Sequence, residues 1–358
     1  MVLIITLTCY SVIVIPKVMA ESAGTGNWIT LILTALIFGV AAVIIVSLNS
    51  MFQGKMLFEY APQIIGKPAT YIVVIFYVMY FFFIVVYLVT MNARLLKADF
   101  FPQTPLWSFP LIGIPVFCFI ANKGITNVSR LAELIGVVFI ITAIFVHLIM
   151  VSQGKISRIQ PFFNAAEIKN YVEAFKYSIF PFLGIELLLA IPLTKKNGKK
   201  AKRTAFLTIM FIGLFYIFLV ESCIMKVGLN DIVNFKDALI VAIRDTSPEK
   251  IVIFTRMDIL YLTIGFSALF VGFSIVIAVI AEYLSRIFNN IKKSMIITII
   301  GIITYIIFFL VKDLAKYEQF VEDIGTYLGL MTCFVIPVCL LFLAKIRKVQ
   351  KKGKRNAS

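Results

Sequence analysis

Charged side chains are scarce in this chain of 358 residues: Asp, Glu, Lys and Arg together make up 15% of it, and only one histidine is present. Soluble domains carry about 25% charged residues, whereas 61% of the residues here are hydrophobic. A soluble fold of this length would have to expose large apolar patches. The composition therefore argues against a soluble protein and predicts one that is embedded in lipid.

Motifs of the common catalytic and metal sites are also missing. The sequence contains no Walker loop, no GxGxxG, no HExxH and no recognisable pairing of a nucleophile with a base. The five cysteines form no CxxC and all lie in apolar runs, so neither a disulfide framework nor a zinc site is expected. A single histidine leaves too few ligands for most transition metals. We therefore expect no enzyme activity, no cofactor and no metal.

The formal charge of +16 does not indicate a nucleic-acid partner. Basic patches bind phosphate backbones, but here the Lys and Arg residues are spread over short loops and the C-terminal tail. No aromatic residues alternate with them as in single-strand binders. The lipid bilayer is the partner that this composition predicts.

Apolar runs that could cross a bilayer, which takes about 20 residues, fill the chain. They predict an all-α integral membrane protein with about ten transmembrane helices over 1–344 and a basic cytoplasmic tail over 345–358. The runs are 1–20, 28–49, 69–93, 106–122, 131–152, 175–193, 204–225, 258–283, 294–311 and 324–344. The first run ends in small residues like those of a signal peptide, but no basic residue precedes Lys17, so we expect a retained helix.

The distribution of basic residues predicts the orientation. The loop at 195–203 is short and its only charges are positive, and the tail is strongly basic. The positive-inside rule assigns such segments to the cytoplasm. With ten helices, both the N-terminus and the C-terminus are expected in the cytoplasm.

Ten helices divide into two halves of five, and because five is odd the halves would lie inverted in the membrane. The opening helix of each half carries breaking residues: Ile15-Pro16 in helix 1, and 180–184 with Pro192 in helix 6. Proline removes a backbone donor, and glycine permits unwinding. Interrupted helices at matching positions indicate a binding site near the middle of the membrane. The sequence thus predicts a 5+5 inverted repeat with interrupted helices 1 and 6.

Several short segments follow one another in an order that covers nearly the whole chain. They are IPK at 15–17, NWITL at 27–31, LFEY at 57–60, GK at 66–67, TP at 104–105, GI at 124–125, VSRL at 128–131, FLGIE at 182–186, Pro192 before a lysine run, Arg256 and YLG at 327–329. In order and spacing, the chain resembles the B subunit of bacterial spore germinant receptors, a branch of the amino acid–polyamine–organocation permease superfamily. One departure is that the glycine-rich break usual in the family's first helix reads Thr8-Cys9-Tyr10-Ser11 here.

The resemblance implies a permease fold, residence in the spore inner membrane and a complex with A and C receptor subunits. It also implies that the protein senses a small nutrient, often an amino acid. We therefore expect a membrane subunit that binds an amino acid-like nutrient and triggers germination. Two alternatives stay open: a proton-coupled amino acid permease, and a pore for water or ions that the ligand gates.

Ionisable and small polar residues inside the predicted helices are the candidate substrate-binding residues. Glu186, two residues after Gly184, offers a carboxylate to an ammonium group or a proton; the alternative is a hydrogen bond that only packs helices. Thr8 and Ser11 lie at a suitable depth in helix 1, and bonds between helices are their alternative role. Ser267 and Gly272 lie on the small face of helix 8, next to a ligand or a close-packed helix.

Four further residues in or near the predicted helices could have either a functional or a purely structural role. Tyr80 and His147 are possible pore-lining residues, although a bond between helices is the expected role of His147. Glu221 is expected to be a structural carboxylate near the outer end of helix 7. Glu282 precedes Arg286 by four residues, which favours a helical ion pair at the inner end of helix 8.

Overall fold

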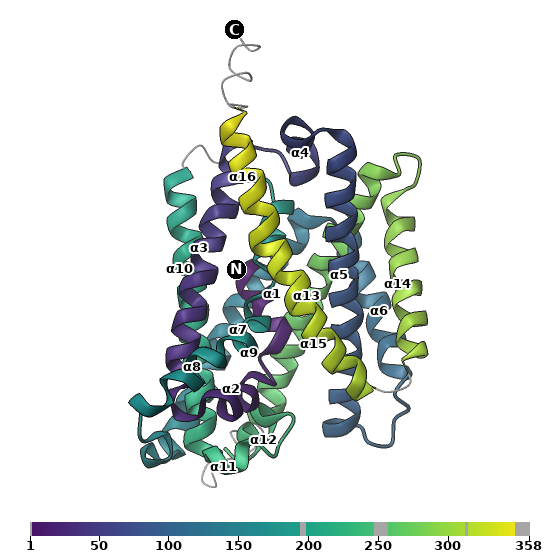
Figure 1. Cartoon of the computed structure of the whole chain (residues 1–358). Helices are drawn as coiled ribbons and strands as arrows, with labels where there is room; N and C mark the ends of the chain where they lie inside the picture. Colours follow the sequence, from purple (N-terminus) through teal and green to yellow (C-terminus); the bar gives the residue numbers. More distant parts are fainter. Residues whose placement is uncertain (1, 194–197, 247–256, 312–313, 348–358) are drawn as a thin grey trace. The chain divides into compact units, whose positions relative to one another are not determined.

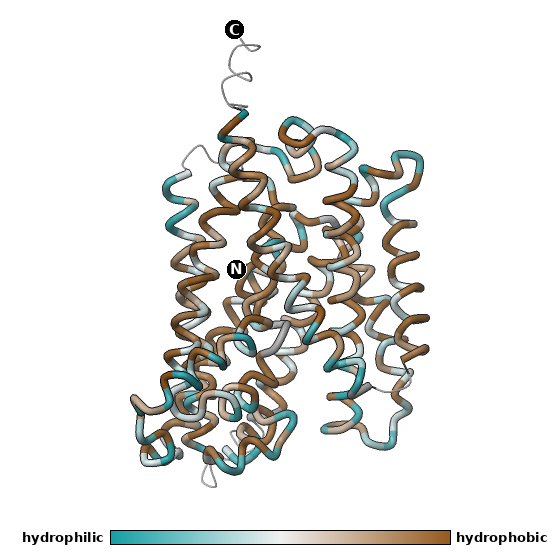
Figure 2. Tube along the Cα trace, viewed as in Figure 1, coloured by the Kyte–Doolittle hydropathy of each residue, from teal (hydrophilic) through white to brown (hydrophobic). Residues whose placement is uncertain are grey.

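The computed structural model describes residues 2–193, 198–246, 257–311 and 314–347, and every regular element in these ranges is a helix (Figure 1). Within them, seven helical stretches are long and apolar enough to cross a membrane. These are Ile15–Met51, Lys67–Phe100, Ile125–Gln153, Gly198–Val227, Ile259–Ile287, Lys293–Leu310 and Lys316–Ile346. Hydrophobic residues follow the middle of these helices, and hydrophilic residues collect at their ends (Figure 2). The protein is a multi-pass membrane protein, as predicted.

The three remaining predicted runs are short or broken. The run at 106–122 is the 15-residue helix α6 (Ser108–Asn122), which contains Pro115. The run at 1–20 is divided between α1 (Val2–Ser11) and α2 (Ile15–Ala23). The run at 175–193 is divided into several short pieces. Proline or glycine accompanies each of the two breaks, which is why these segments do not form one long helix.

The break in helix 1 lies at residues 12–14, after the segment 8–11 and just before Pro16. Proline has no N–H to bond the carbonyl four residues earlier, here that of Val12. The interrupted helix 1 is therefore present although the family's glycines are missing. The boundary predicted at residue 20 is displaced, because α2 ends at Ala23 and the 3₁₀ turn η1 (Gly24–Gly26) connects it to α3 (Asn27–Met51).

Helix 6 is interrupted at Gly184. α9 (Phe175–Ser178) and the 3₁₀ turn η5 (Phe180–Phe182) precede the break, and a second 3₁₀ segment, η6 (Ile185–Ala190), follows it. Gly184 has φ 124°, a region that glycine occupies without steric penalty. The interruption is as predicted, and the segment after it is a 3₁₀ helix. Pro192 cannot donate to the carbonyl of Leu188, which accepts from the Ile191 N–H at 3.2 Å and from the Asn49 side chain at 2.7 Å.

The chain divides into two compact units. Unit 1 comprises 1–38, 130–182 and 207–272, and unit 2 comprises 39–129, 183–206 and 273–358. The helices α3, α7 (Ile125–Gln153), α10 (Gly198–Val227) and α13 (Met257–Ile287) each begin in one unit and end in the other.

Short helices surround α2 within unit 1. They are α8 (Ile168–Glu173), α9, α11 (Leu229–Ile232) and α12 (Ala238–Arg244). The segment that carries the 3₁₀ turn η4 (Ala165–Glu167) and α8 is also bonded to the start of α3, because the Thr30 hydroxyl donates to the Tyr171 carbonyl at 2.8 Å. The α2–α3 connection of unit 1 is therefore covered by packed helical turns.

Helix α5 (Lys67–Leu95) is the centre of unit 2. It packs against α4 (Leu57–Ile65), α6, α14 (Lys293–Leu310) and α15 (Leu314–Leu330). After α15 the chain continues through a π-helical turn, η8 (Met331–Val335), into α16 (Ile336–Ile346). The turn η8 packs against η6, so the segment after the Gly184 break is held inside this unit.

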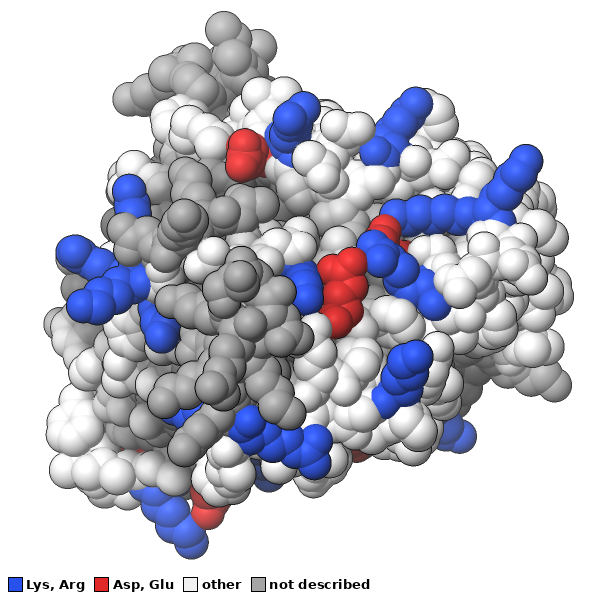
Figure 3. All heavy atoms as spheres, turned by 90° about the horizontal axis from the view of Figure 1, so that it is seen from above, with Lys and Arg blue, Asp and Glu red and all other residues white. Residues whose placement is uncertain are grey.

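An ion-pair network lies at one end of unit 2. The predicted pair of Glu282 and Arg286 is present at 3.3 Å, and Arg286 also contacts Glu59 of α4 at 3.0 Å. Lys293 pairs with the second oxygen of Glu282, and Arg347 donates to the Ile64 carbonyl. The view onto the α4 end of the molecule shows more basic than acidic side chains (Figure 3). This distribution is the one that the positive-inside rule associates with the cytoplasm.

The helix contact at Gly213 gives a test of the packing of unit 1. A Cβ on Gly213 of α10 would lie 2.5 Å from the Cβ of Ala35 in α3, whereas a Cβ on Gly265 of α13 would meet only Phe139, at 4.0 Å. We predict that Gly213→Ala destabilises the protein by about 1–3 kcal/mol. Gly265→Ala should be neutral or stabilise by about 0.4–1 kcal/mol, because alanine restricts the unfolded chain. Thermal unfolding midpoints of the two variants in detergent measure the difference, and equal midpoints would contradict this packing.

Candidate functional site

Tyr216 of α10 holds the two interrupted helices side by side within unit 1. Its side chain is fully buried, and its hydroxyl lies 3.0 Å from the carbonyl of Leu7 in α1 and 3.0 Å from that of Pro181 in η5. The two carbonyls share one hydroxyl proton. Helix ends leave backbone carbonyls without helical partners, and lipid supplies none. Tyr216 is thus the group that satisfies backbone at both interrupted helices.

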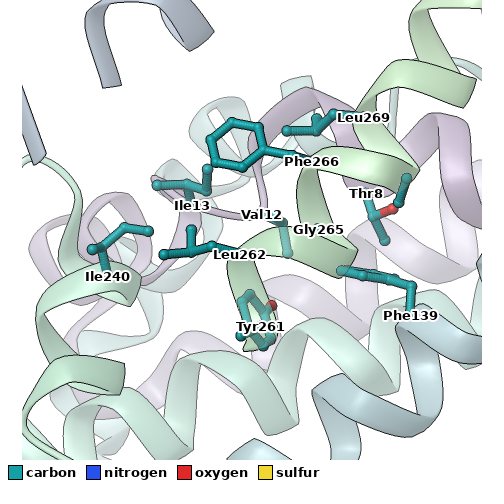
Figure 4. A pocket seen from close by; sticks show the side chains of 11 residues that line it. Thr8, Val12, Ile13, Phe139, Ile240, Tyr261, Leu262, Gly265, Phe266 and Leu269 are labelled. Atoms are coloured by element: carbon teal, nitrogen blue, oxygen red, sulfur yellow. The ribbon is translucent and has the colours of Figure 1, made fainter. Parts of the chain in front are cut away.

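A small cavity lies beside the break in helix 1, within unit 1 (Figure 4). Its walls are Thr8, Val12 and Ile13 from α1 and the break, Tyr261, Leu262, Gly265, Phe266, Ala268 and Leu269 from α13, Phe139 from α7 and Ile240 from α12. Its volume is about 20 Å³. A single water needs at least about 10–15 Å³ by the same measure. In this conformation the cavity is therefore closed to anything much larger than water.

The surface of the cavity is apolar. The Thr8 hydroxyl bonds the carbonyls of Ile4 and Ile5 in its own helix, at 2.9 and 3.0 Å. The Tyr261 hydroxyl is buried and has no hydrogen-bond partner among the described residues. The cavity therefore offers space for hydrocarbon next to one hydroxyl group whose hydrogen-bonding capacity is unused.

The cavity contains one of the three residues predicted from helices 1 and 8 that the structure describes in full, Thr8, Ser267 and Gly272. Thr8 lines it, together with Gly265 of α13. The Ser267 hydroxyl bonds the Thr263 carbonyl of its own helix at 2.8 Å, and Gly272 is buried further along α13. Ser11 ends α1, and its side chain lies outside the described part of the structure. The binding roles of these residues stay predictions.

His147 makes the bond between helices that was its expected role. Its side chain is fully buried, and Nδ1 lies 2.7 Å from the Ser222 hydroxyl of α10. Its ring also packs edge-on against Tyr261, with ring centroids 6.0 Å apart. His147 thus supports the wall of the cavity from behind, and its pore-lining role stays a prediction.

Glu186 is the most buried of the carboxylates that the structure describes in unit 2. Its Oε2 accepts from the Gly184 N–H at 2.8 Å and from the Cys333 thiol of η8 at 2.8 Å. Its Oε1 is buried and has no hydrogen-bond partner among the described residues, none of whose basic side chains pairs with it. The Gly184 break thus presents a carboxylate with one oxygen that is not engaged.

Tyrosine side chains surround this carboxylate in unit 2. Tyr80 lies close enough for its hydroxyl to interact with the Glu186 carboxylate. Next to it, the Tyr77 hydroxyl donates to the Thr332 carbonyl of η8 at 2.7 Å. Both tyrosines come from α5 and are almost fully buried. Tyr80 was predicted as a pore-lining residue, and what the structure adds is that it lies beside Glu186.

Sequence reasoning missed Tyr216 and Tyr261. Both lie in apolar helices rich in aromatic residues, where a tyrosine is usually part of the packed core. For Tyr261 a signal was present, since it lies one helical turn from Gly265 on the small face of helix 8. No local signal identifies Tyr216, because its two partners come from segments far away in the sequence.

Two solved structures share this fold. The crystal structure of MhsT in complex with L-phenylalanine matches with a TM-score of 0.67 and 11% identity, over 96% of this chain and 88% of that one. The structure of Mhp1, a nucleobase-cation-symport-1 family transporter with bromovinylhydantoin bound, matches with a TM-score of 0.58 and 10% identity, over 96% and 92%. At this identity the likeness shows the fold alone. It confirms the predicted inverted-repeat architecture.

The sequence comparisons define the family. The family model described as "Spore germination protein" matches residues 1–316, and this chain belongs to that family. A curated relative, spore germination protein YndE of Bacillus subtilis (strain 168), is 20% identical over 345 residues, which are 95% of this chain and 93% of the relative. The resemblance found in the sequence is thereby confirmed.

Removal of one hydroxyl group tests the link between the interrupted helices. We predict that Tyr216→Phe lowers the stability of the protein by about 1–3 kcal/mol, because two buried carbonyls lose their donor. Tyr327→Phe is the matched control, since Tyr327 is 71% exposed. The thermal midpoint in detergent should fall only for Tyr216→Phe. An unchanged midpoint would show that water or another group satisfies these carbonyls.

Proposed function

We propose that this protein is the membrane subunit of a nutrient germinant receptor, which binds a small amino acid-like nutrient within the membrane and thereby triggers spore germination. The observation that carries this proposal is the Glu186 carboxylate at the break of helix 6, buried, without a cationic partner among the described residues and with Oε1 unengaged. The family supports a role in germination. The partners that we propose are A and C receptor subunits in the spore inner membrane.

The chemistry of Glu186 favours a ligand with an ammonium group. A buried charge without a partner is unfavourable by several kcal/mol, and ionisable groups inside a membrane usually mark ligand or ion sites. An ammonium group would donate to Oε1 and neutralise the carboxylate. The shared fold with MhsT, which was solved in complex with L-phenylalanine, is consistent with an amino acid as the ligand.

The small volume of the cavity in unit 1 favours a receptor mechanism that includes a change of conformation. Ligand sites usually measure about 300–1,000 Å³, and the cavity beside Thr8 and Gly265 holds about 20 Å³. Any nutrient that enters this place has to favour a more open state. A ligand shifts such an equilibrium only by the difference between its affinities for the two states. We propose that the partner subunits respond to this shift.

A proton-coupled amino acid permease is the second candidate, because Mhp1, which shares the fold, is named as a transporter. The two functions differ in what the isolated chain does. Uptake of a labelled amino acid into proteoliposomes that contain only this protein would favour the permease. Loss of germination in one nutrient after gene deletion, with uptake unchanged, would favour the receptor. A ligand-gated pore for water or ions stays open as a third prediction.

Glu186→Gln tests the carboxylate directly. Removal of one partner from a buried charge pair costs about 2–5 kcal/mol, so the nutrient concentration for half-maximal germination should rise at least about tenfold, or the response should vanish. Glu173→Gln is the control, because the Glu173 side chain is 61% exposed. Both variants should reach the membrane in equal amounts by immunoblot. A normal dose response in Glu186→Gln spores would exclude Glu186 from the site.

A substitution at Gly184 gives a second test of the Glu186 site. Gly184→Val places a β-branched residue at φ 124°, which strongly disfavours the turn that orients the Glu186 carboxylate. We expect a loss of the nutrient response with the protein still in the membrane. A wild-type dose response would mean that the break is not needed.

Gly265→Ala tests the cavity of unit 1, since the added methyl group points toward Phe139 across open space and should leave the fold intact. We predict that the nutrient concentration for half-maximal germination rises several-fold, because the methyl group fills space that a change of conformation within unit 1 would use. Thr263→Ala, an exposed position on the same helix, is the control. An unchanged dose response would show that this cavity takes no part in the response.

A further inference from the structure

Two polar side chains with unengaged oxygen atoms meet near one end of unit 1. Asn27, the first residue of α3, is fully buried, and its Nδ2 lies 3.0 Å from Oε1 of Glu221 in α10. The same Nδ2 donates to the Gly24 carbonyl at 3.0 Å. The remaining oxygens, Asn27 Oδ1 and Glu221 Oε2, are buried and have no hydrogen-bond partner among the described residues.

A flip of the Asn27 amide does not give these two oxygen atoms hydrogen-bond partners. If the Asn27 amide were flipped, its oxygen would face the Gly24 carbonyl and Glu221 Oε1, which would place acceptors against an acceptor. The observed orientation is therefore fixed by its two bonds. A proton on Glu221 Oε2 would have only Asn27 Oδ1 as its acceptor, so a proton is the alternative occupant of this place.

The neighbouring basic side chains of unit 1 are engaged elsewhere. Arg158 donates to the carbonyls of Met225 and Lys226. The Lys226 ammonium lies 3.4 Å from Asp245 and 2.9 Å from Gln153 Oε1. Glu221 is therefore left with an amide as its only polar partner among the described residues.

Acceptor oxygens of a carboxylate and an amide are the ligands that hard cations prefer. Only one carboxylate is present, and the described residues contain no group of three His, Cys, Asp or Glu side chains that could hold a metal ion. Divalent cations are usually bound by more negative charge than this. We propose that Asn27 and Glu221 bind an alkali metal cation, which joins the start of α3 to α10.

The surroundings suit a bound ion that stabilises this end of the unit. Tyr171 of α8 packs on Gly26, the residue before Asn27, so closely that a Cβ there would lie 2.3 Å from its ring. The ion therefore sits beneath the α8 segment, and its loss loosens the α2–α3 connection. This site is separate from Glu186 and does not depend on the proposed nutrient.

Thermal unfolding of the purified full chain in detergent tests the proposal without any nutrient. At constant ionic strength, replacement of choline chloride by sodium or potassium chloride should raise the midpoint of the wild-type protein by at least about 2 °C, because the ion binds only the folded state. The variants Glu221→Gln and Asn27→Ala should lose this shift. Glu173→Gln should keep it.

Three results would overturn the site. The first is equal midpoints in all salts for the wild type, which would leave the two oxygens to a water molecule. The second is a full cation shift in Glu221→Gln. The third is stabilisation by methylammonium chloride and not by the alkali salts, which would assign the site to an amine. Since Asn27→Ala removes an amide that bonds two groups, Glu221→Gln is the decisive variant if Asn27→Ala fails to fold.

Discussion

Polar groups inside a membrane need protein partners, and this requirement organises the protein at the points where its helices break. A continuous helix satisfies its own backbone, and an interrupted one does not. At helix 1 and helix 6 the Tyr216 hydroxyl reaches one carbonyl on each side, that of Leu7 in α1 and that of Pro181 in η5. After the second break, the side chain of Asn49 adds a hydrogen bond to the Leu188 carbonyl, which also accepts from the Ile191 N–H. The breaks are thus built into the structure by side chains from distant segments.

Among the described residues, some of the buried polar atoms without a hydrogen-bond partner lie near these breaks, and others lie at Asn27 and Glu221. Glu186 uses one oxygen to hold the Gly184 turn and leaves the other unengaged. Tyr261 forms a wall of the closed cavity with its hydroxyl unused. Native proteins leave few buried groups unsatisfied, so each of these atoms indicates a ligand, an ion or a second conformation. The nutrient and cation sites proposed above rest on this reasoning.

Much of the fold was accessible from the sequence, because lipid imposes a simple pattern. Long apolar runs gave the spanning helices, and Pro16 and Gly184 gave the interruptions. The 3₁₀ form of η6 was not predictable, since it depends on how Asn49 and η8 meet that segment.

The site was accessible only in part. Thr8 and Glu186 stood out as polar residues in apolar runs, whereas Tyr216 and Tyr261 did not differ from core aromatics. The contact between Asn27 and Glu221 joins residues 194 positions apart, and no local pattern reveals such a pair.

Competition binding tests the central claim most directly. A labelled amino acid that triggers germination is bound to the purified subunit and displaced by two unlabelled compounds, the same amino acid and its analogue without the amino group. If an ammonium group is held by the Glu186 carboxylate, the amino acid displaces the label and the deaminated analogue fails to do so at a hundredfold excess, about 2.7 kcal/mol weaker. Equal displacement by both compounds would contradict the account.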